Sequence, residues 1–166
     1  MAAKSPVILI LGYGANIGKS VANKFSSQGY KVAVAARSVK EDDTDTFLSI
    51  PSDFSKTESI TNAFDQVKQK FGIPSVVVYN GFLAAGIGKS GAAYMTWTAS
   101  EAYKNRGFKF YYADERKPDG GPIYRVNEDA HGDMYWELSQ GKEQGPWMQS
   151  FVKGIGYKAF DTIYER

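Results

Sequence analysis

Cysteine is absent from the 166 residues of this chain, and histidine occurs once, at His131. Disulfides, thiolate metal sites and cysteine nucleophiles are therefore excluded, and a metal site built from several histidines cannot form. Neither sign of charge dominates, because twenty basic and eighteen acidic side chains leave a net charge of +2, and no run of five like charges occurs. We therefore expect no nucleic-acid surface and no polybasic membrane patch.

Long hydrophobic runs are missing as well. No apolar stretch approaches the roughly 20 residues that a membrane helix needs. The run at residues 7–11 is too short for a signal peptide and fits a buried strand instead. The sequence thus predicts a soluble protein of the cytoplasm with no membrane partner, and its length predicts a single domain over residues 1–166.

The first eighty residues alternate apolar strands with amphipathic helices. A helix of about fourteen residues should end at Gly29, and a second one carries apolar residues from Ile60 to Phe71 at helical spacing. Residues 38–46 are polar and predict a solvated loop. Strands are expected at residues 7–11, 31–36, 47–50 and 75–79. Because helices of this length connect parallel neighbours, this order predicts an α/β fold with a mostly parallel sheet.

The second half follows a less regular pattern. Its expected elements are a long helix at residues 89–106, an alternating strand at 108–112, a turn at 117–122 and a second helix at 130–139. An aromatic tail at residues 145–166 is expected to wrap a surface. His131 lies among acidic residues and could act as a general base, but we expect a surface residue near a helix start. This half therefore points to no reaction by itself.

A glycine-rich turn, residues 12–18, follows the first strand and leads into a helix. Such a turn presents unpaired N–H groups and the positive end of a helix dipole, which favour a phosphate or pyrophosphate. The spacing is G-x-G-x-x-x-G, one residue longer than the usual dinucleotide motif, and glycines that only allow a tight turn are the alternative. The turn therefore predicts a phosphate site.

Two residues that follow the second and third strands, Arg37 and Asp53, indicate which nucleotide is expected. Arg37 directly follows the second strand, and the nearest acid that could bind a ribose hydroxyl is Glu41, four residues on, so Arg37 favours NADP over NAD. A solvated loop cation is the alternative for Arg37. Asp53 follows the third strand and could accept a hydrogen bond from the adenine amino group, or it could cap the following turn.

These motifs, in this order, resemble the first half of a short-chain dehydrogenase/reductase. Gly12 and Gly18 match the outer glycines of the family's T-G-x-x-x-G-x-G motif, with Asn16 in place of the middle glycine; asparagine tolerates positive φ, so the turn is expected to survive. Asp53 resembles the family's adenine-contacting Asp, and Asn80 resembles the second Asn of its N-N-A-G segment. The resemblance covers residues 7–80.

The resemblance implies a Rossmann-like three-layer sandwich, with a nucleotide-binding half at residues 1–81 and a divergent half at 82–166. It implies that NADP is the cofactor, with NAD less favoured, and that a carbonyl or alcohol small molecule is the substrate. The residues that it places at the cofactor are Gly12, Gly14, Asn16, Ile17, Gly18, Arg37, Asp53, Asn80 and Lys89.

The family's catalytic Tyr-x-x-x-Lys motif is incomplete in this chain. Lys89 stands in the place of the catalytic Lys, but Ala85 stands in the place of the Tyr, and none of the eleven tyrosines has a Lys four residues later. The resemblance therefore implies an oxidoreductase whose proton donor is unidentified. The alternatives are a catalytically impaired pseudo-enzyme that binds a nucleotide or substrate, or acts as a cyclase-like template, and a product without function.

The middle of the family's fold is also missing. Asn80 and Lys89 are nine residues apart, where the family has two helices and the strand with its catalytic Ser and Asn. A sheet truncated in this way leaves two apolar edges uncovered. Three outcomes follow: the second half adds to the fourth strand, two chains pair as a homo-oligomer that completes the sheet, or the chain folds poorly.

Overall fold

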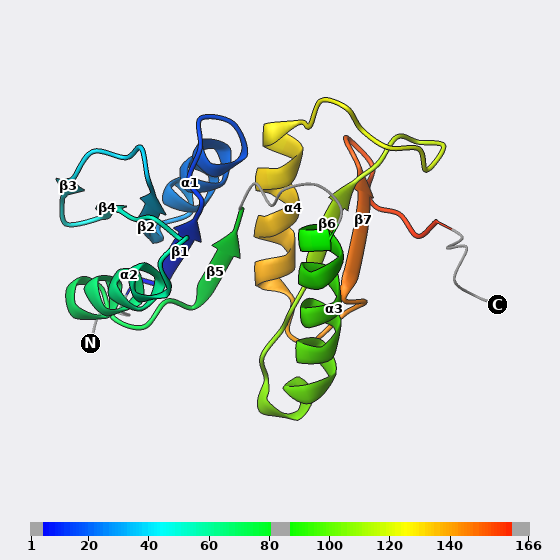
Figure 1. Cartoon of the computed structure of the whole chain (residues 1–166). Helices are drawn as coiled ribbons and strands as arrows, with labels where there is room; N and C mark the ends of the chain where they lie inside the picture. Colours follow the sequence, from blue (N-terminus) through cyan, green and yellow to red (C-terminus); the bar gives the residue numbers. More distant parts are fainter. Residues whose placement is uncertain (1–4, 81–86, 161–166) are drawn as a thin grey trace. The chain divides into compact units, whose positions relative to one another are not determined.

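The computed structural model describes residues 5–80 and 87–160, and the chain divides into two compact units, Met1–Phe82 and Leu83–Arg166 (Figure 1). Each unit has its own sheet, with five strands in the first and three in the second. No helix among the described residues is long and apolar enough to cross a membrane.

The first unit contains a five-stranded sheet in the order β3-β4-β2-β1-β5. Its strands are β1 (Val7–Leu11), β2 (Lys31–Ala36), β3 (Asp42–Asp43), β4 (Phe47–Pro51) and β5 (Val76–Tyr79). All neighbours are parallel except β3, which runs antiparallel to β4. The predicted α/β class and mostly parallel sheet are confirmed. The prediction that residues 38–46 form only a loop is wrong at β3, where Asp42 and Asp43 pair with β4.

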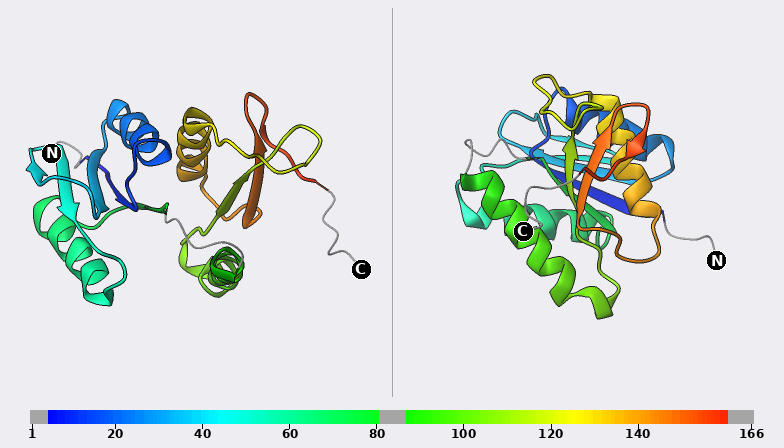
Figure 2. Two further views of the ribbon diagram at one scale, coloured as in Figure 1. Left: turned by 45° about the horizontal axis from the view of Figure 1, so that its top comes forward. Right: turned by 90° about the vertical axis from the view of Figure 1, so that its right-hand side faces the viewer.

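Two helices, α1 (Ile17–Ser27) and α2 (Thr57–Lys70), cover the two faces of this sheet, as Figure 2 shows. Every residue of β1 is buried, because β1 is central and both of its faces are covered. Leu9 packs in one cluster with Val67 of α2 and with Phe71 just beyond it. Side chains alternate along a strand, so the intervening residues of β1 point to the face of α1. The first unit thus forms the three-layer sandwich that was expected.

The second unit contains two helices and a three-stranded sheet in the order β6-β7-β8. Its elements are α3 (Ile87–Ala102), the 3-10 helix η1 (Lys104–Arg106), β6 (Tyr112–Glu115), α4 (Glu128–Gln140), β7 (Met148–Val152) and β8 (Gly156–Tyr157). β6 and β7 are parallel and are connected through α4, whereas β8 turns back antiparallel to β7. The predicted helices at residues 89–106 and 130–139 are present as α3 and α4.

Two predictions for the second unit are wrong. The strand expected at residues 108–112 begins only at Tyr112, because the backbone of Phe110 is bonded to a side chain: its N–H donates to Gln144 Oε1 at 2.7 Å, and its carbonyl accepts from Gln144 Nε2 at 3.1 Å. The tail expected to wrap a surface from residue 145 contains β7 and β8 instead.

β5 is an edge strand of its sheet. In the part of the chain that the structure describes it pairs only with β1, and Val77 and Tyr79 remain 46% and 52% exposed. Within the described residues β6 does not pair with β5 but belongs to the other sheet. The first unit therefore has the open strand edge that a missing central segment predicts.

Candidate nucleotide site

The candidate site lies along one edge of the first unit's sheet. Leu11, the last residue of β1, pairs with Ala35 of β2 and with Tyr79 of β5, so the carboxyl ends of these parallel strands are level. β2 lies on one side of β1 and β5 on the other, which makes the end of β1 the switch point of the strand order. Ligands of open parallel sheets bind at such a point.

The turn after β1 requires glycine at its first position. Gly12 has a φ of +87°, in the left-handed region that L residues with a side chain rarely adopt. Its N–H donates to the carbonyl of Ala35 at 2.9 Å, and the N–H of Tyr13 donates to the same oxygen at 3.2 Å. These two amides are therefore engaged by β2, so any anion at this turn must use amides further along.

The other two glycines of the turn, Gly14 and Gly18, differ in the space around them. A Cβ on Gly18 would lie 3.0 Å from Cα and 3.3 Å from the carbonyl carbon of Tyr13, so the start of α1 packs against backbone. A Cβ on Gly14 would meet nothing within 4 Å. Gly18 thus closes the turn onto the helix, whereas Gly14 faces open space that a ligand could enter.

Asn16 adopts a conformation other than the expected one. Its φ is −94°, and no described residue other than glycine has a positive φ, so the turn does not depend on the left-handed tolerance of asparagine. Asn16 is the N-cap of α1, but its side chain makes no capping hydrogen bond. Ile17 begins the helix, and its first turn contains no acidic residue. The Lys19 N–H in this turn donates to the Gly14 carbonyl at 3.0 Å, so the positive dipole end and the amides before Lys19 are the groups suited to an anion.

Asn80 connects the end of β5 to the glycine turn. Its backbone N–H donates to the Leu11 carbonyl at 2.8 Å, and its side-chain Nδ2 donates to the Gly12 carbonyl at 3.3 Å. Asn80 thus holds the Gly12 peptide from the β5 side, whereas Ala35 holds it from the β2 side. Its place beside a cofactor stays a prediction.

Arg37 and Asp53 follow β2 and β4 at the same edge. Arg37 is exposed. Asp53 Oδ1 accepts a hydrogen bond from the Ser55 N–H at 3.1 Å, which confirms the turn-capping alternative for this residue. That hydrogen bond is the main reason why the pKa of Asp53 is lowered, and the positive charges of Lys56 and Arg37 add to the effect. The contact of Asp53 with an adenine stays a prediction.

Lys89 belongs to the second unit, where it is an exposed residue in the first turn of α3. Ala85, at the place of the family's catalytic Tyr, lies outside the described residues. The role of Lys89 beside a nicotinamide ribose therefore stays a prediction.

The expectation that His131 lies on the surface is wrong. It is 5% exposed, because its side of α4 faces the sheet and its ring packs edge-on against Phe151 at 5.0 Å between centroids. Its Nδ1 lies 2.9 Å from the Asn127 carbonyl and 3.6 Å from Glu115 Oε2. Sequence reasoning missed Glu115, because a strand end reading Asp-Glu-Arg gives no sign that its middle residue is buried.

The parallel sheet, the left-handed Gly12 at the switch point and the helix start closed by Gly18 define a Rossmann-like fold, of the class that binds dinucleotides. The family profile described as short chain dehydrogenase matches residues 6–103. The chain is also 32% identical to a short chain dehydrogenase/reductase, dmxR12, from Cryptosporiopsis, over 94% of this chain and 95% of that protein. The chain belongs to the short-chain dehydrogenase family.

The alignment with the Cryptosporiopsis protein also shows that this chain is the shorter of the two. It extends over 234 positions, although this chain has only 166 residues, so several tens of residues of the relative have no counterpart here. This finding agrees with a chain whose middle is missing.

Solved structures share the fold. A short-chain dehydrogenase from Mycobacterium thermoresistibile has a TM-score of 0.69 at 11% identity, over 89% of this chain and 84% of its own. A protein described as a 3-oxoacyl-reductase from Bacillus thuringiensis has a TM-score of 0.68 at 11% identity, over 91% of this chain and 98% of its own.

Proposed function

We propose that the protein is an NADP(H)-dependent oxidoreductase that transfers a hydride to or from a carbonyl or alcohol group of a small molecule. The turn between β1 and α1 carries this proposal. Its first residue, Gly12, is left-handed, Gly18 closes it onto the helix, and the first helical turn has no acid to oppose a phosphate. These features suit the pyrophosphate of a dinucleotide.

The residues of the first unit would bind and orient the cofactor. The amides of residues 14–18 would hold the pyrophosphate, while Asn80 keeps the Gly12 peptide in place from β5. Arg37 would pair with the 2′-phosphate of NADP, and Asp53 would accept from the adenine. The bound nicotinamide supplies the hydride chemistry, and the protein contributes position and electrostatics.

The resemblance assigns Lys89 to the nicotinamide ribose. The sequence offers no tyrosine four residues before Lys89 to move the hydroxyl proton, because that position is Ala85. This substitution favours a second candidate function, a pseudo-enzyme that binds the nucleotide without turnover. The two functions share the same nucleotide site and differ only in the redox step.

The binding half of the proposal is tested by calorimetric titration of the protein with NADPH and NADH, because all three tryptophans lie in the second unit, whereas the turn belongs to the first. The Arg37→Glu variant should weaken NADPH binding by about tenfold or more, because it replaces an ion pair with a repulsion, and should leave NADH binding nearly unchanged. Lys40→Glu, an exposed charge reversal three residues away, is the matched control and should bind both nucleotides as the parent does. Failure to bind either nucleotide would refute the proposal.

The turnover half is tested by following NADPH consumption over a panel of aldehydes, ketones and quinones. Consumption with any of them supports the oxidoreductase. Nucleotide binding without consumption of NADPH assigns the protein to the pseudo-enzyme.

We also propose that two copies pair through the open edge of β5. The support is the unpaired side of β5, with Val77 and Tyr79 exposed, together with the edge position of β6 in its own sheet. Each copy could add a strand to the other, which would complete two sheets at once. Sedimentation equilibrium should then give twice the mass of the chain, and a monomer at micromolar concentration would refute the pairing.

A further inference from the structure

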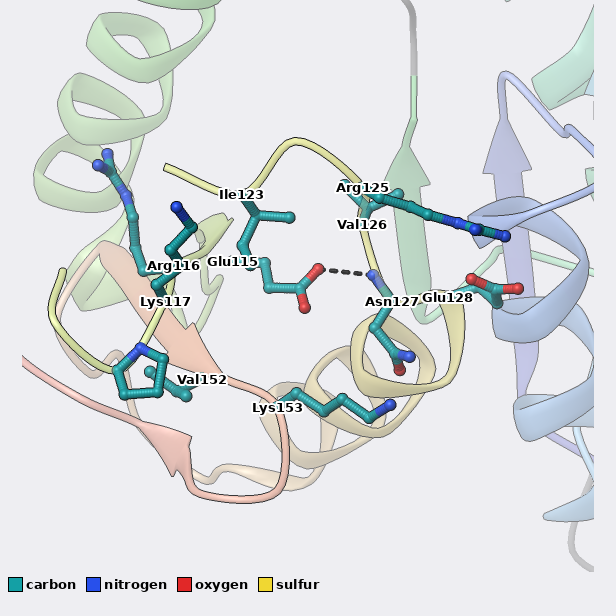
Figure 3. A pocket seen from close by; sticks show the side chains of 11 residues that line it. Glu115, Arg116, Lys117, Ile123, Arg125, Val126, Asn127, Glu128, Val152 and Lys153 are labelled. Atoms are coloured by element: carbon teal, nitrogen blue, oxygen red, sulfur yellow. Dashed lines mark hydrogen bonds between the residues drawn. The ribbon is translucent and has the colours of Figure 1, made fainter. Parts of the chain in front are cut away.

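In each unit a buried polar side chain on a strand holds a neighbouring loop. In the second unit Glu115, which lines the pocket of Figure 3, accepts a hydrogen bond from the Asn127 N–H at 2.7 Å, drawn there as a dashed line. In the first unit Ser49 is 7% exposed in the middle of β4, and its Oγ donates to the carbonyl of Lys40. Lys40 lies only three residues beyond Arg37, so this serine holds the loop that begins with the proposed partner of the 2′-phosphate.

The loop of residues 37–41 crosses the carboxyl end of β4. In the strand order β3-β4-β2, β4 separates β2, where the loop begins, from β3, where it ends (Figure 1). β2 is parallel to β4, and β3 is antiparallel to it. Both ends of the loop therefore lie at the edge of the sheet that carries the candidate nucleotide site.

β4 holds this loop at both of its ends. At the start, the Ser52 N–H donates to the Ala36 carbonyl at 3.0 Å. At the end, Asp42 pairs with Ser49 in the ladder of β3 and β4, and the Ser49 hydroxyl adds its bond to Lys40. The path of the loop is thus fixed by main-chain bonds and by one side-chain hydroxyl.

Packing within β4 does not explain the serine. Its neighbours Leu48 and Ile50 belong to the apolar cluster that also contains Val67 of α2. Neighbouring side chains of a strand point to opposite faces, so Ser49 points away from that cluster. A buried hydroxyl has to be hydrogen-bonded, and the partner of this one is a loop carbonyl. The hydroxyl therefore serves the loop rather than the core.

The closed loop separates Arg37 from the acids that follow it. Residues 41–45 contain four acids: Glu41, Asp42, Asp43 and Asp45. Asp42 and Asp43 lie on β3, two strand spacings or about 10 Å from β2, which exceeds the Debye length of about 8 Å at physiological salt. Asp43 also forms an ion pair with Lys70 of α2. The acids of β3 therefore repel a phosphate beside Arg37 only weakly.

The other charges at the ends of β2 and β4 leave a net cation. Residues 37–41 carry a net charge of +1, from Arg37, Lys40 and Glu41. Residues 53–56 carry no net charge, because Asp53 and Lys56 have opposite signs. A phosphate is thus favoured here as long as β3 keeps its acids on the far side of β4.

We propose that Ser49 is a positioning residue that makes this loop select NADP(H) over NAD(H). Its hydroxyl holds residues 37–41 across β4, which keeps Arg37 beside β2 for a 2′-phosphate and keeps the acids of β3 away. When that bond is absent, the loop opens more often, and an acid near the ribose favours the hydroxyl of NAD(H) instead. This inference rests on the proposed NADP(H) function and adds a determinant of cofactor choice.

Calorimetric titration of the full chain with NADPH and NADH tests the selection. Loss of one neutral hydrogen bond changes an equilibrium by about two- to tenfold, so Ser49→Ala should bind NADPH about three- to tenfold more weakly and NADH about as the parent does. The control is Ser75→Ala. Ser75 Oγ donates to the Val7 carbonyl at 3.2 Å at the opposite edge of the same sheet, so this variant should bind both nucleotides as the parent does.

Two further comparisons assign the effect to the hydroxyl and to Arg37. Ser49→Thr keeps the hydroxyl and should keep the preference for NADPH, whereas Ser49→Val, of nearly the same shape as the threonine variant, should lose it. In the Arg37→Ala background, Ser49→Ala should not change the ratio of the NADPH and NADH affinities further, because the serine acts through the arginine. Equal preference in the threonine and valine variants, or a fully additive effect in the double variant, would overturn the positioning role.

Amide hydrogen exchange gives a readout that needs no nucleotide. The amides of residues 38–43 should exchange about two- to tenfold faster in Ser49→Ala than in the parent or in Ser75→Ala. Unchanged exchange would show that the hydroxyl does not hold the loop. A parent that binds both nucleotides equally would refute the proposed NADP(H) function and the selection together. A parent that prefers NADPH, with a Ser49→Ala variant that keeps this preference, would refute the role of Ser49 alone.

Discussion

Alanine at Gly14 and alanine at Gly18 should have opposite effects on stability, although both glycines belong to one motif. In Gly18→Ala the new Cβ would lie 3.0 Å from Cα of Tyr13, whose N–H is held by the Ala35 carbonyl. Overpacking of this kind costs about 1–3 kcal/mol, and alanine in a helix regains about 1 kcal/mol over glycine. The free energy of unfolding should therefore fall by up to about 2 kcal/mol.

Gly14→Ala should leave the fold intact. The new Cβ meets nothing within 4 Å, and Gly14 is not among the glycines with positive φ. Because alanine restricts the unfolded chain more than glycine does, the free energy of unfolding should stay unchanged or rise by about 0.4–1 kcal/mol. If the open space at Gly14 receives the pyrophosphate, the same methyl group should weaken NADPH binding by about tenfold or more.

Urea unfolding followed by far-ultraviolet circular dichroism gives the stabilities, because all three tryptophans lie in the second unit and do not report the first. Calorimetric titration gives the NADPH affinities. The expected pattern is that Gly18→Ala loses stability and affinity, whereas Gly14→Ala loses affinity alone. If Gly14→Ala binds NADPH like the parent, no ligand approaches that position and the pyrophosphate assignment fails. Equal losses of stability in the two variants would refute the packing argument.

Two further predictions concern a buried tyrosine and the end of β5. Burial raises the pKa of Tyr135 to about 12, so the stability that its neutral hydroxyl provides is present below the unfolded value of 10.0 and is lost as the pH rises through 12. Between neutral pH and about pH 12 the parent should lose up to about 3 kcal/mol more unfolding free energy than Tyr135→Phe, and equal losses would contradict this assignment. Asn80→Asp should cost about 1–3 kcal/mol, because a carboxylate oxygen would face the Gly12 carbonyl that now accepts from Nδ2 at 3.3 Å, whereas Asn80→Ala should cost only about 1 kcal/mol. Equal urea midpoints for the two variants would show that this contact does not matter.

Most of the first unit could be predicted well because its central strands, β1 and β2, are apolar along nearly their whole length. A central parallel strand is covered on both faces, so β1 and β2 appear in the sequence as continuous hydrophobic runs. β6 and β7 carry polar residues within their strands, such as Asp114 and Gln149. Their positions depend on long-range bonds, for example those of Gln144 with the backbone of Phe110, which no local pattern contains.

The candidate site could be predicted only in part. The need for glycine at residue 12 followed from the motif, and its φ of +87° confirms it. The sequence could not show that Ala35 engages the first two amides of the turn, or that Asn16 keeps a negative φ. These properties arise from the register between β1 and β2, which is a tertiary feature.

The division into two units separates most residues proposed for cofactor binding from Lys89, the residue proposed for turnover. Each unit retains parallel strands connected through a helix, so the loss of a segment between them leaves each sheet paired internally. All residues proposed to hold the nucleotide except Lys89 lie in the first unit. Binding should therefore survive a disturbed second unit, whereas the proposed hydride transfer would require Lys89 to reach the nicotinamide ribose. Comparing NADPH affinity with NADPH consumption in Lys89→Ala measures that requirement directly: affinity within about threefold of the parent with consumption abolished supports the role, and unchanged consumption refutes it.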